Sequence, residues 1–344
     1  MSTCFSPMYI YVRSRQLEKT YNSDPKIGCW PISALRILRG WGAPLEEQWP
    51  YVGDIKSWPP KEPVGIDQYA NEHKIFAYQR VCSAKECKLA LATGFPVTIT
   101  VEITNSWYAA KMGEIQLPKE GDKRAGGHCV TLFGYDDHKG VFQFQNSWGK
   151  EWGNKGYGSL PYRYIDLLLT EGWVIIPHKD DFGCEKSPGT IERVWGIPAI
   201  LHNVLHGIEI RDSQSNERKS WGFALQYDNH LNVEELFVCP KYRGKGYSRK
   251  LCSHFKELSS LLSLPLRFWV SHADNNRNNI TIVRHMADIF GFTISDSFVR
   301  WAALKVEQER TISQKKSSHT KPGIVHRPLR SSSFAYFSDE RYCI

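Results

Sequence analysis

A cysteine that directly precedes a helix-like run could act as a nucleophile. In "DPKIGCWPISALRILRGWG", Cys29 stands before apolar residues at roughly helical spacing, at Ile32, Leu35, Ile37 and Leu38. Free backbone N–H groups at a helix N-terminus favour an anion, so the sequence predicts a lowered pKa for the Cys29 thiol. Free cysteine is also among the residue types most often buried in cores, and Cys29 taken alone leaves this alternative open.

A histidine and an asparagine further along the chain could complete thiol chemistry. His128 begins an apolar, strand-like run in "GGHCVTLFGYDD", and Asn146 ends another in "GVFQFQNSW". Two adjacent antiparallel strands joined by the turn "DDHKG" would place both side chains on one face. A thiol nucleophile needs an imidazole to accept its proton and a third polar group to hold the ring in one tautomer. Taken singly, His128 could be a hydrogen-bonded core residue and Asn146 a strand-end cap.

Three segments of the sequence resemble the cysteine, histidine and asparagine boxes of papain-family peptidases: "GCWPISAL", "GGHCVTLFGYDD" and "NSWGKEWGNKGYGSLPY". The resemblance covers residues 20–177, and "NSWG..WG..GY" is its most specific part. It implies a two-lobed fold with a cleft between a helical lobe and a β-rich lobe. It also implies Cys29 as the nucleophile, His128 as the general base and acid, and Asn146 as the residue that orients the ring. Trp148 would shield Asn146.

The sequence departs from the papain pattern just before the cysteine. The family places a glutamine six residues upstream, where its amide completes the oxyanion hole, but this chain has Ser23 there, with Asn22 beside it. Loss of one oxyanion donor costs roughly 10²–10³-fold in rate unless Asn22 takes the role. Lys26 replaces a family cysteine that usually forms a disulfide. A retired pseudoenzyme is therefore the alternative to an active peptidase or peptide-bond transferase.

A glycine-rich, basic turn between a strand-like and a helix-like run is a second candidate site. In "LFVCPKYRGKGYSRKLCSHF", Gly244 and Gly246 allow backbone N–H groups to converge on an anion, and the following helix N-terminus favours phosphate. Arg243 and Lys245 add positive charge. A plain surface turn is the alternative.

The segment "V.P.YRGKG" between a strand and a helix resembles the acyl-CoA pyrophosphate loop of the GNAT superfamily of N-acyltransferases. "FWVSHADNNRNNITIVRHMADIFGF" resembles the later strand, asparagine-rich turn and helix of the same fold. The resemblance spans residues 191–303 and implies acetyl-CoA as the cofactor. The cofactor-contacting residues that it implies are Val238, Arg243, Gly244, Lys245, Gly246, Tyr247, Ser248 and Asn279.

The catalytic residues of this second half match the superfamily less well. Acetyl transfer needs a base that deprotonates the acceptor ammonium, and Glu234 or Glu235, on the strand before the loop, could serve. Ala287 stands where these enzymes often carry the tyrosine that protonates the departing thiolate, and Ser248 stands where glycine or alanine is usual. The sequence therefore favours cofactor binding over turnover in this half.

Length and composition fit two folded domains. The chain has 344 residues, of which 41% are hydrophobic and 13% aromatic. No apolar run approaches the ~18 residues needed to cross a bilayer, and the N-terminus lacks a secretory signal pattern. Nine cysteines with no CxxC pair indicate reduced thiols in the cytoplasm and no metal site. Residues 305–344 supply half of the formal net charge of +8, so nothing in the folded part indicates nucleic-acid binding.

Helix-like and strand-like runs along the sequence must position these residues. Helix-like runs cover residues 29–39, 85–94 and 248–263, and strand-like runs cover 95–103, 128–137, 140–148, 220–227, 233–239 and 265–272. We predict an α+β chain with a papain-like peptidase domain over residues 1–178, a linker over 179–190, a GNAT-like mixed α/β domain over 191–305 and a basic, disordered tail over 306–344.

These patterns predict a bifunctional intracellular protein. One activity is a cysteine peptidase that works through an acyl-enzyme, and the other is acetyl-CoA-dependent N-acyl transfer. The expected partners are a peptide or protein substrate, acetyl-CoA and an unidentified amine acceptor, with no membrane. The alternative is a cysteine peptidase or peptide transferase whose GNAT-like half only binds acyl-CoA or presents the substrate.

Overall fold

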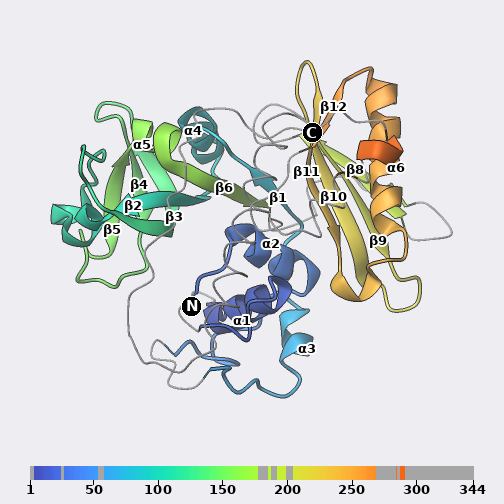
Figure 1. The fold of residues 1–344 in the computed structure, drawn as a ribbon, viewed down its shortest axis with the longest axis horizontal. Helices are drawn as coiled ribbons and strands as arrows, with labels where there is room; N and C mark the ends of the chain where they lie inside the picture. The colour runs from blue at the N-terminus through green and yellow to red at the C-terminus, as the bar shows by residue number, and fades with distance from the viewer. Residues whose placement is uncertain are drawn as a thin grey trace, which may run out of the picture.

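The structure is a computed structural model that describes residues 4–24, 27–52, 58–176, 204–268, 284 and 287–290, and the backbone of 185–186 and 192–198. Figure 1 shows three parts: a helical part, a sheet with two flanking helices, and a C-terminal sheet covered by one helix. The helical part contains α1 (Pro7–Leu17), α2 (Pro31–Gly40) and α3 (Ile66–Ala70).

Helix α2 follows Cys29 and lies at the centre of the molecule (Figure 1). It begins at Pro31, two residues later than the sequence suggests, because proline at the first helical position has its φ preset and needs no hydrogen-bond partner. Ile37 of α2 packs with Met8, Tyr9 and Val12 of α1. The helix that follows the candidate nucleophile is thus fixed on one side by α1.

The first sheet has the strand order β1-β6-β2-β3-β4-β5, and every neighbouring pair is antiparallel. Its strands are β1 (Ala77–Arg80), β2 (Val97–Thr104), β3 (Arg124–Asp136), β4 (Val141–Gln145), β5 (Tyr157–Pro161) and β6 (Leu169–Ile176), and α4 (Ala84–Ala92) and α5 (Tyr162–Leu168) accompany it. Alternate residues of β2 point into its core, as a half-buried strand requires. The predicted hairpin of β3 and β4 is confirmed, with Leu132 opposite Phe144.

The second sheet has the order β12-β11-β10-β9-β8-β7. Its strands are β7 (Glu185–Lys186), β8 (Glu192–Pro198), β9 (Val204–Arg211), β10 (Arg218–Gln226), β11 (Leu231–Val238) and β12 (Leu266–Phe268), and α6 (Tyr247–Leu262) covers one face. Strands β11 and β12 are parallel, whereas the others pair antiparallel. A parallel pair needs a crossover, and α6 provides it.

Parts of the predicted domain division can be compared with this structure. Strand β7 lies inside the predicted linker, so the second sheet extends into that segment. The predicted tail over 306–344 and Asn279 lie outside the described residues. The predicted alternation of strands and one helix in the second half is confirmed, while its identity as an acyltransferase stays a prediction. Nowhere in the described ranges does a helix have the length and apolar character needed to cross a bilayer.

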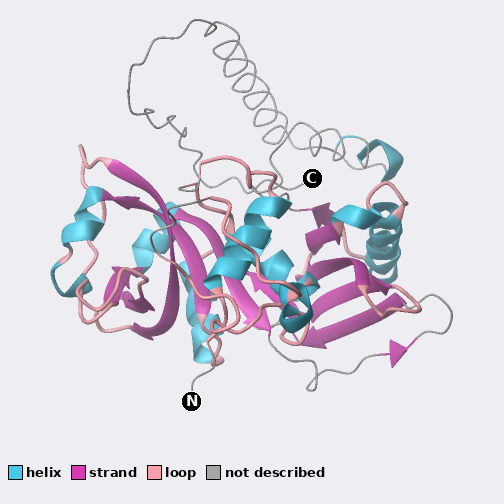
Figure 2. Cartoon of the chain, turned by 90° about the horizontal axis from the view of Figure 1, so that it is seen from below, coloured by secondary structure: helices cyan, strands magenta, loops and turns pink. Residues whose placement is uncertain are grey.

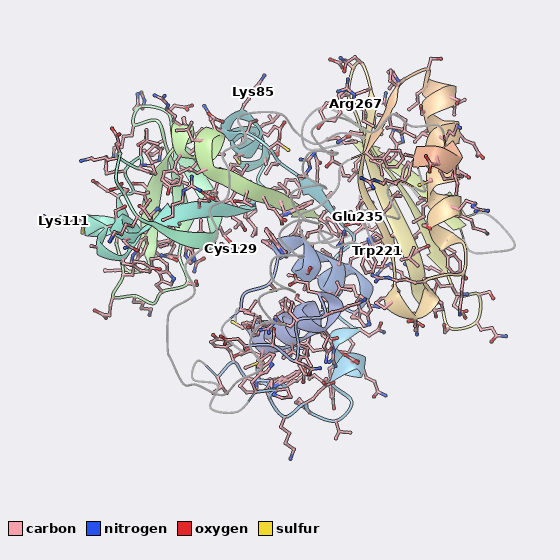
Figure 3. All side chains as sticks on the ribbon, viewed as in Figure 1. Lys85, Lys111, Cys129, Trp221, Glu235 and Arg267 are labelled. Atoms are coloured by element: carbon pink, nitrogen blue, oxygen red, sulfur yellow. The ribbon has the colours of Figure 1, made fainter. Side chains whose placement is uncertain are left out.

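One of the hydrophobic clusters contains residues of both halves. Strand β10 turns Ala224 toward α6 and turns Trp221 and Phe223 toward the N-terminal half. There they join a single buried cluster with Ile32 of α2 and Trp173 of β6. Figure 2 shows helices lying between the two sheets, with further helices on their outer sides, and Figure 3 places Trp221 where the C-terminal sheet meets α2. The C-terminal sheet is therefore packed against the helix that follows Cys29.

Candidate active site

Cys29 lies just before α2, and its side chain is partly exposed. The backbone N–H of Trp30 donates a hydrogen bond of 2.8 Å to Glu18 Oε1. The N–H of Ile32 donates one of 3.3 Å to Glu171 Oε2. Two carboxylates thus accept from the first amides of the helix, where the helix dipole favours negative charge.

The expectation of a lowered Cys29 pKa is wrong for this resting structure. Burial raises the pKa of the thiol to about 12, and the negative charge of Glu18 raises it further. The helix N-terminus that was expected to stabilise a thiolate already has the carboxylate of Glu18 on the Trp30 N–H. Cys29 is therefore a neutral thiol at neutral pH.

His128 and Asn146 meet as the hairpin prediction requires. His128 Nε2 lies 2.8 Å from Asn146 Oδ1, and the Ser147 backbone N–H donates to the same oxygen at 2.8 Å. A carboxamide oxygen only accepts hydrogen bonds, so Nε2 must carry the ring proton. Nδ1 is then the basic nitrogen of His128, as a general base requires.

Aromatic rings enclose this pair. The ring of Trp148 packs on the His128 ring with centroids 4.4 Å apart, and Trp107 meets the same ring edge-on at 6.0 Å. Burial lowers the pKa of His128, although its bond to Asn146 acts in the opposite direction. His128 is therefore neutral at neutral pH and able to take up a proton.

Cys29 and His128 are not bonded to each other in the resting structure. Within the described ranges no hydrogen bond joins the Cys29 thiol to the His128 ring. Cys129, the next residue of β3 after His128, is close enough to contribute to the raised pKa of Cys29. The fold thus brings the thiol near this part of β3 but leaves the two catalytic candidates as separate neutral groups.

The two candidate oxyanion donors lie on the loop before the cysteine. Ser23 Oγ donates to the Thr20 carbonyl and accepts from Arg15 Nη2 at 2.9 Å, whereas Asn22 is exposed. Neither side chain hydrogen-bonds to Cys29 in the described part of the chain. The structure therefore leaves the oxyanion role of Asn22 and Ser23 a prediction, and Lys26 lies outside the described residues.

Sequence reasoning missed Arg15, a fully buried arginine of α1. Its guanidinium donates to three backbone carbonyls of the loop that leads to the cysteine, those of Thr20, Asp24 and Ile27. Its Nε donates to the Thr20 hydroxyl at 2.8 Å. No pattern around position 15 signals this role, because the loop carbonyls come within reach only in the folded chain.

A hollow of about 600 Å³ opens beside Trp148. It is lined by Tyr108, Ala109, Ala110, Trp148, Glu151, Trp152 and Gly153. Trp148 belongs both to this lining and to the stack on His128. A molecule bound in the hollow would therefore contact the tryptophan that packs on His128.

A cysteine before a helix, a histidine on a strand and an asparagine directly after the neighbouring strand define the class of thiol peptidases. Comparison with known proteins agrees: residues 19–164 match the family described as "Papain family cysteine protease". These residues form a papain-family cysteine peptidase domain. The prediction made from the three boxes is thus confirmed for this part of the chain.

Several relatives show the same likeness. An uncharacterized peptidase C1-like protein of Acanthamoeba polyphaga mimivirus is 28% identical over 184 residues, which are 49% of this chain and 58% of the viral protein. Mouse cathepsin K (Mus musculus) is 28% identical over 128 residues, 36% of this chain and 37% of the cathepsin. The crystal structure of Xylellain, a cysteine protease from Xylella fastidiosa, is 31% identical and has a TM-score of 0.47, covering 51% of this chain and 70% of that one. The chain spans less than two thirds of the length of the viral protein and of cathepsin K.

The glycine turn of the second half has the predicted position between a strand and a helix. Gly244 and Gly246 have φ of 77° and 82°, in the left-handed region that favours glycine, and α6 begins at Tyr247. No atom would lie within 4 Å of a Cβ at either glycine, so the turn is open to its surroundings. Arg243 Nε donates to the Val238 carbonyl at 3.1 Å, which ties the turn to the end of β11. The remaining cofactor candidates of the turn, Lys245 and Ser248, lie within this segment.

Glu234 and Glu235 are placed differently from what a general base requires. Glu234 Oε2 lies 2.6 Å from Arg80 Nε, and Glu235 forms a two-pronged ion pair with Arg36. Both carboxylates are buried and bonded to arginines of the N-terminal half. Nothing in this arrangement supports the predicted base role, because both carboxylates already accept hydrogen bonds from arginine side chains. Ala287 is buried.

Proposed function

We propose that the N-terminal half cleaves peptide bonds through an acyl-enzyme formed on Cys29. The observation that carries this proposal is the 2.8 Å contact between His128 Nε2 and Asn146 Oδ1, which leaves Nδ1 as a base. The papain-family match of residues 19–164 supports the same chemistry. The substrate class is a peptide or protein.

The chemistry begins with two neutral groups. As the Cys29 sulfur attacks the scissile carbonyl carbon, its proton moves to His128 Nδ1. The tetrahedral intermediate then breaks its C–N bond, and the imidazolium returns the proton to the leaving amine. Water attacks the resulting thioester with His128 again as the base, and this step frees the carboxylate and restores the thiol.

The raised pKa of Cys29 and the lowered pKa of His128 favour the neutral pair over a preformed thiolate–imidazolium pair. Substrate must then bring the sulfur and Nδ1 together, since the resting structure has no bond between them. We infer that Cys29 reacts slowly with small reagents that alkylate thiols, and that contacts with the substrate are needed to activate it. Such dependence would restrict cleavage to few substrates.

Two peptide-bond reactions share this machinery. If an amine instead of water takes the acyl group from Cys29, the product is a new peptide bond, and the protein is a peptide transferase. The hollow beside Trp148, with Glu151 on its lining, could hold either a leaving segment or an incoming amine.

Hydrolysis is tested with a fluorescence-quenched casein and with a proteome-derived peptide library, read by mass spectrometry. We expect new termini with the wild-type chain and none with Cys29→Ala. Added glycinamide separates the two reactions, because a transferase yields amidated products. Equal products from wild type and Cys29→Ala would overturn the proposal.

As a second candidate we propose that the C-terminal half binds an acyl-CoA at the turn Arg243–Ser248. The positive φ values of Gly244 and Gly246, the open space around them and the helix that begins at Tyr247 support it. Because Glu234 and Glu235 are held in ion pairs with arginines, we favour binding of acyl-CoA without acyl transfer. A cytoplasmic location stays a prediction as well.

Calorimetric titration with acetyl-CoA tests this second candidate. We expect binding by the wild type and a loss of binding in Gly246→Pro, because proline cannot adopt a positive φ. Dephospho-CoA and free pantetheine show which part of the cofactor is held. Undetectable binding by the wild type would overturn the proposal that this half binds acyl-CoA, and it would not affect the peptidase proposal.

A further inference from the structure

The C-terminal sheet contacts α2, the helix that follows Cys29, through charged side chains from three strands. We propose that this sheet is a built-in scaffold for the peptidase site and that Glu235 and Glu209 are positioning residues, which fix α2 through Arg36 and Arg39. The expected effect of these residues on turnover rests on the proposed peptidase function, whereas their effect on the position of α2 does not.

The first contact joins α2 to β11. Arg36 Nε and Nη2 donate to the two oxygens of Glu235 at 3.0 and 2.9 Å. The two side chains are 6% and 2% exposed, so water does not compete for this pair. A bidentate arginine–carboxylate pair fixes both distance and orientation. Glu235 therefore fixes the position of α2 along β11.

The same carboxylate also holds the first sheet of the peptidase domain. Tyr78 of β1 donates its hydroxyl to Glu235 Oε2 at 3.0 Å, and Trp221 Nε1 donates to the Tyr78 oxygen at 3.3 Å. Arg80, two residues further along β1, pairs with Glu234. Glu235 is thus the point at which α2, β1 and β11 meet (Figure 3).

A β-bulge makes this double attachment possible. Phe223 of β10 lies opposite Glu235 and Ala224 lies opposite Val233, so Glu234 is an extra residue in β11. In a regular strand two successive side chains point to opposite faces, and a bulge redirects one of them. Glu234 and Glu235 can therefore both reach arginines of the N-terminal half.

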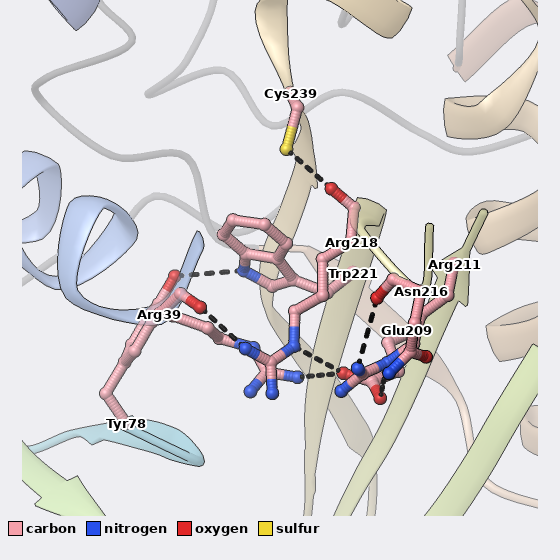
Figure 4. Close-up of polar contacts among 8 residues, drawn as sticks. All are labelled: Arg39, Tyr78, Glu209, Arg211, Asn216, Arg218, Trp221 and Cys239. Carbon is pink, nitrogen blue, oxygen red and sulfur yellow. Dashed lines mark hydrogen bonds and ion pairs between the residues drawn. The ribbon is translucent and has the colours of Figure 1, made fainter. Parts of the chain in front are cut away.

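The second contact lies at the end of α2. Arg39 Nη2 donates to Glu209 Oε2 of β9 at 2.9 Å, and Arg218 Nη1 of β10 donates to the Arg39 carbonyl at 2.8 Å (Figure 4). A cation at the helix C-terminus stabilises its unpaired carbonyls. At Gly40 a Cβ would lie 3.1 Å from Trp221 Cη2, so the small residue allows the sheet to approach closely.

These contacts come from β9, β10 and β11, and all of them end on one helix of ten residues. Cys29 is two residues before the start of that helix. His128 lies on a different element, β3. A displacement of α2 would therefore move the Cys29 thiol relative to His128. Catalysis is sensitive to such displacements, since about 1 Å can cost on the order of 10²-fold in rate.

The experiment compares Glu235→Gln with Glu217→Gln in the full chain. Glu217 pairs with Lys241 on the surface of the same sheet, so the second variant matches the first in chemistry and in domain. Hydrogen exchange of residues 30–40 is read by mass spectrometry below the melting temperature of each variant. Turnover of the quenched casein gives kcat and KM.

We expect Glu235→Gln to speed amide exchange in α2 and to lower kcat on the order of tenfold with KM little changed. Glu217→Gln should behave as the wild type does. Arg36→Lys is the second variant if Glu235→Gln does not fold, because lysine keeps the charge but lacks the planar fork. We expect the same changes from it in a weaker form.

The outcomes separate this inference from the proposed function. A wild type that exchanges slowly in α2 but hydrolyses nothing would overturn the peptidase proposal, while the exchange comparison would still test the scaffold. Folded Glu235→Gln and Arg36→Lys chains with wild-type exchange in α2 and wild-type kcat would overturn the scaffold role.

Discussion

His128 Nε2, on β3, and Asn146 Oδ1, in the residue that directly follows β4, are 2.8 Å apart, and the two strands form an antiparallel hairpin. The Ser147 N–H holds the same oxygen from the other side, so the carboxamide cannot turn without losing a second bond. This relationship sets the tautomer of His128 and gives the first prediction.

Asn146→Ala should lower kcat/KM by roughly 10²-fold, because the imidazole loses the group that orients it. The effect should fall on kcat rather than on KM. Steady-state cleavage of the quenched casein measures both. Gln145→Ala, one residue earlier on the exposed face of β4, is the matched control, and an equal loss in both variants would contradict an orienting role.

Glu18→Gln should lower the pKa of Cys29. The glutamine oxygen can still accept from the Trp30 N–H, but the negative charge that disfavours a thiolate is gone. The alkylation rate of Cys29 by iodoacetamide, followed by mass spectrometry against pH, should therefore rise at lower pH than in the wild type. Glu47→Gln, an exposed carboxylate on the loop after α2, serves as the control. Identical profiles for Glu18→Gln and the wild type would mean that burial alone controls the thiol.

Arg15→Ala should destabilise the fold by about 3 kcal/mol, because it leaves the carbonyls of the loop before Cys29 without a buried donor. Urea unfolding measures the loss. Arg13→Ala on the same helix removes an arginine whose partners, Glu62 and Asp67, stay open to water. It should cost about 1 kcal/mol or less. If both variants lose the same stability, the special role of Arg15 is refuted.

Stability at acid pH should depend on Glu209. Burial alone would raise the pKa of this carboxyl, but Arg39, Arg218 and Arg211 outweigh it and hold the pKa at about 2, below the usual 4.5. A lowered pKa contributes stability that is fully present above pH 4.5 and is lost as the pH falls toward 2. The contribution is about 3 kcal/mol.

The matching variant is Glu209→Gln. It should be less stable than the wild type at pH 7, and the difference between the two should shrink as the pH falls from 4.5 to 2. Chemical unfolding at several pH values measures this. Glu47→Gln should follow the wild type throughout, and a constant gap between Glu209→Gln and the wild type would contradict the assignment.

Short-range patterns explain why much of the peptidase half could be predicted. The strand-like runs that became β2, β3 and β4 alternate or cluster apolar residues, and the helix-like run that became α4 has a serine cap at Ser83. Strands β1, β5 and β6 were missed. Strands β1 and β6 pair with strands far away in sequence, so no hairpin turn in the sequence marks them.

The second half shows how far the same patterns reach. They located β10, β11 and α6 closely. They could not say that β11 turns two glutamates toward the N-terminal half, because the bulge that does so depends on its register with β10. Adjacent acidic residues after a strand-like start were thus read as candidates for a base instead of as partners of Arg80 and Arg36.

The sequence by itself determined which residues could do chemistry, since Cys29, His128 and Asn146 stand in local boxes whose spacing follows from one helix and one hairpin. Only the tertiary structure decided the protonation state of Cys29 and the position of the helix that follows it. The pKa of Cys29 depends on burial and on Glu18, and the position of α2 depends on Glu235 and Glu209, about 200 and 170 residues further along the chain. Burial and charge are set by whatever surrounds a group in space, and local sequence does not contain that information.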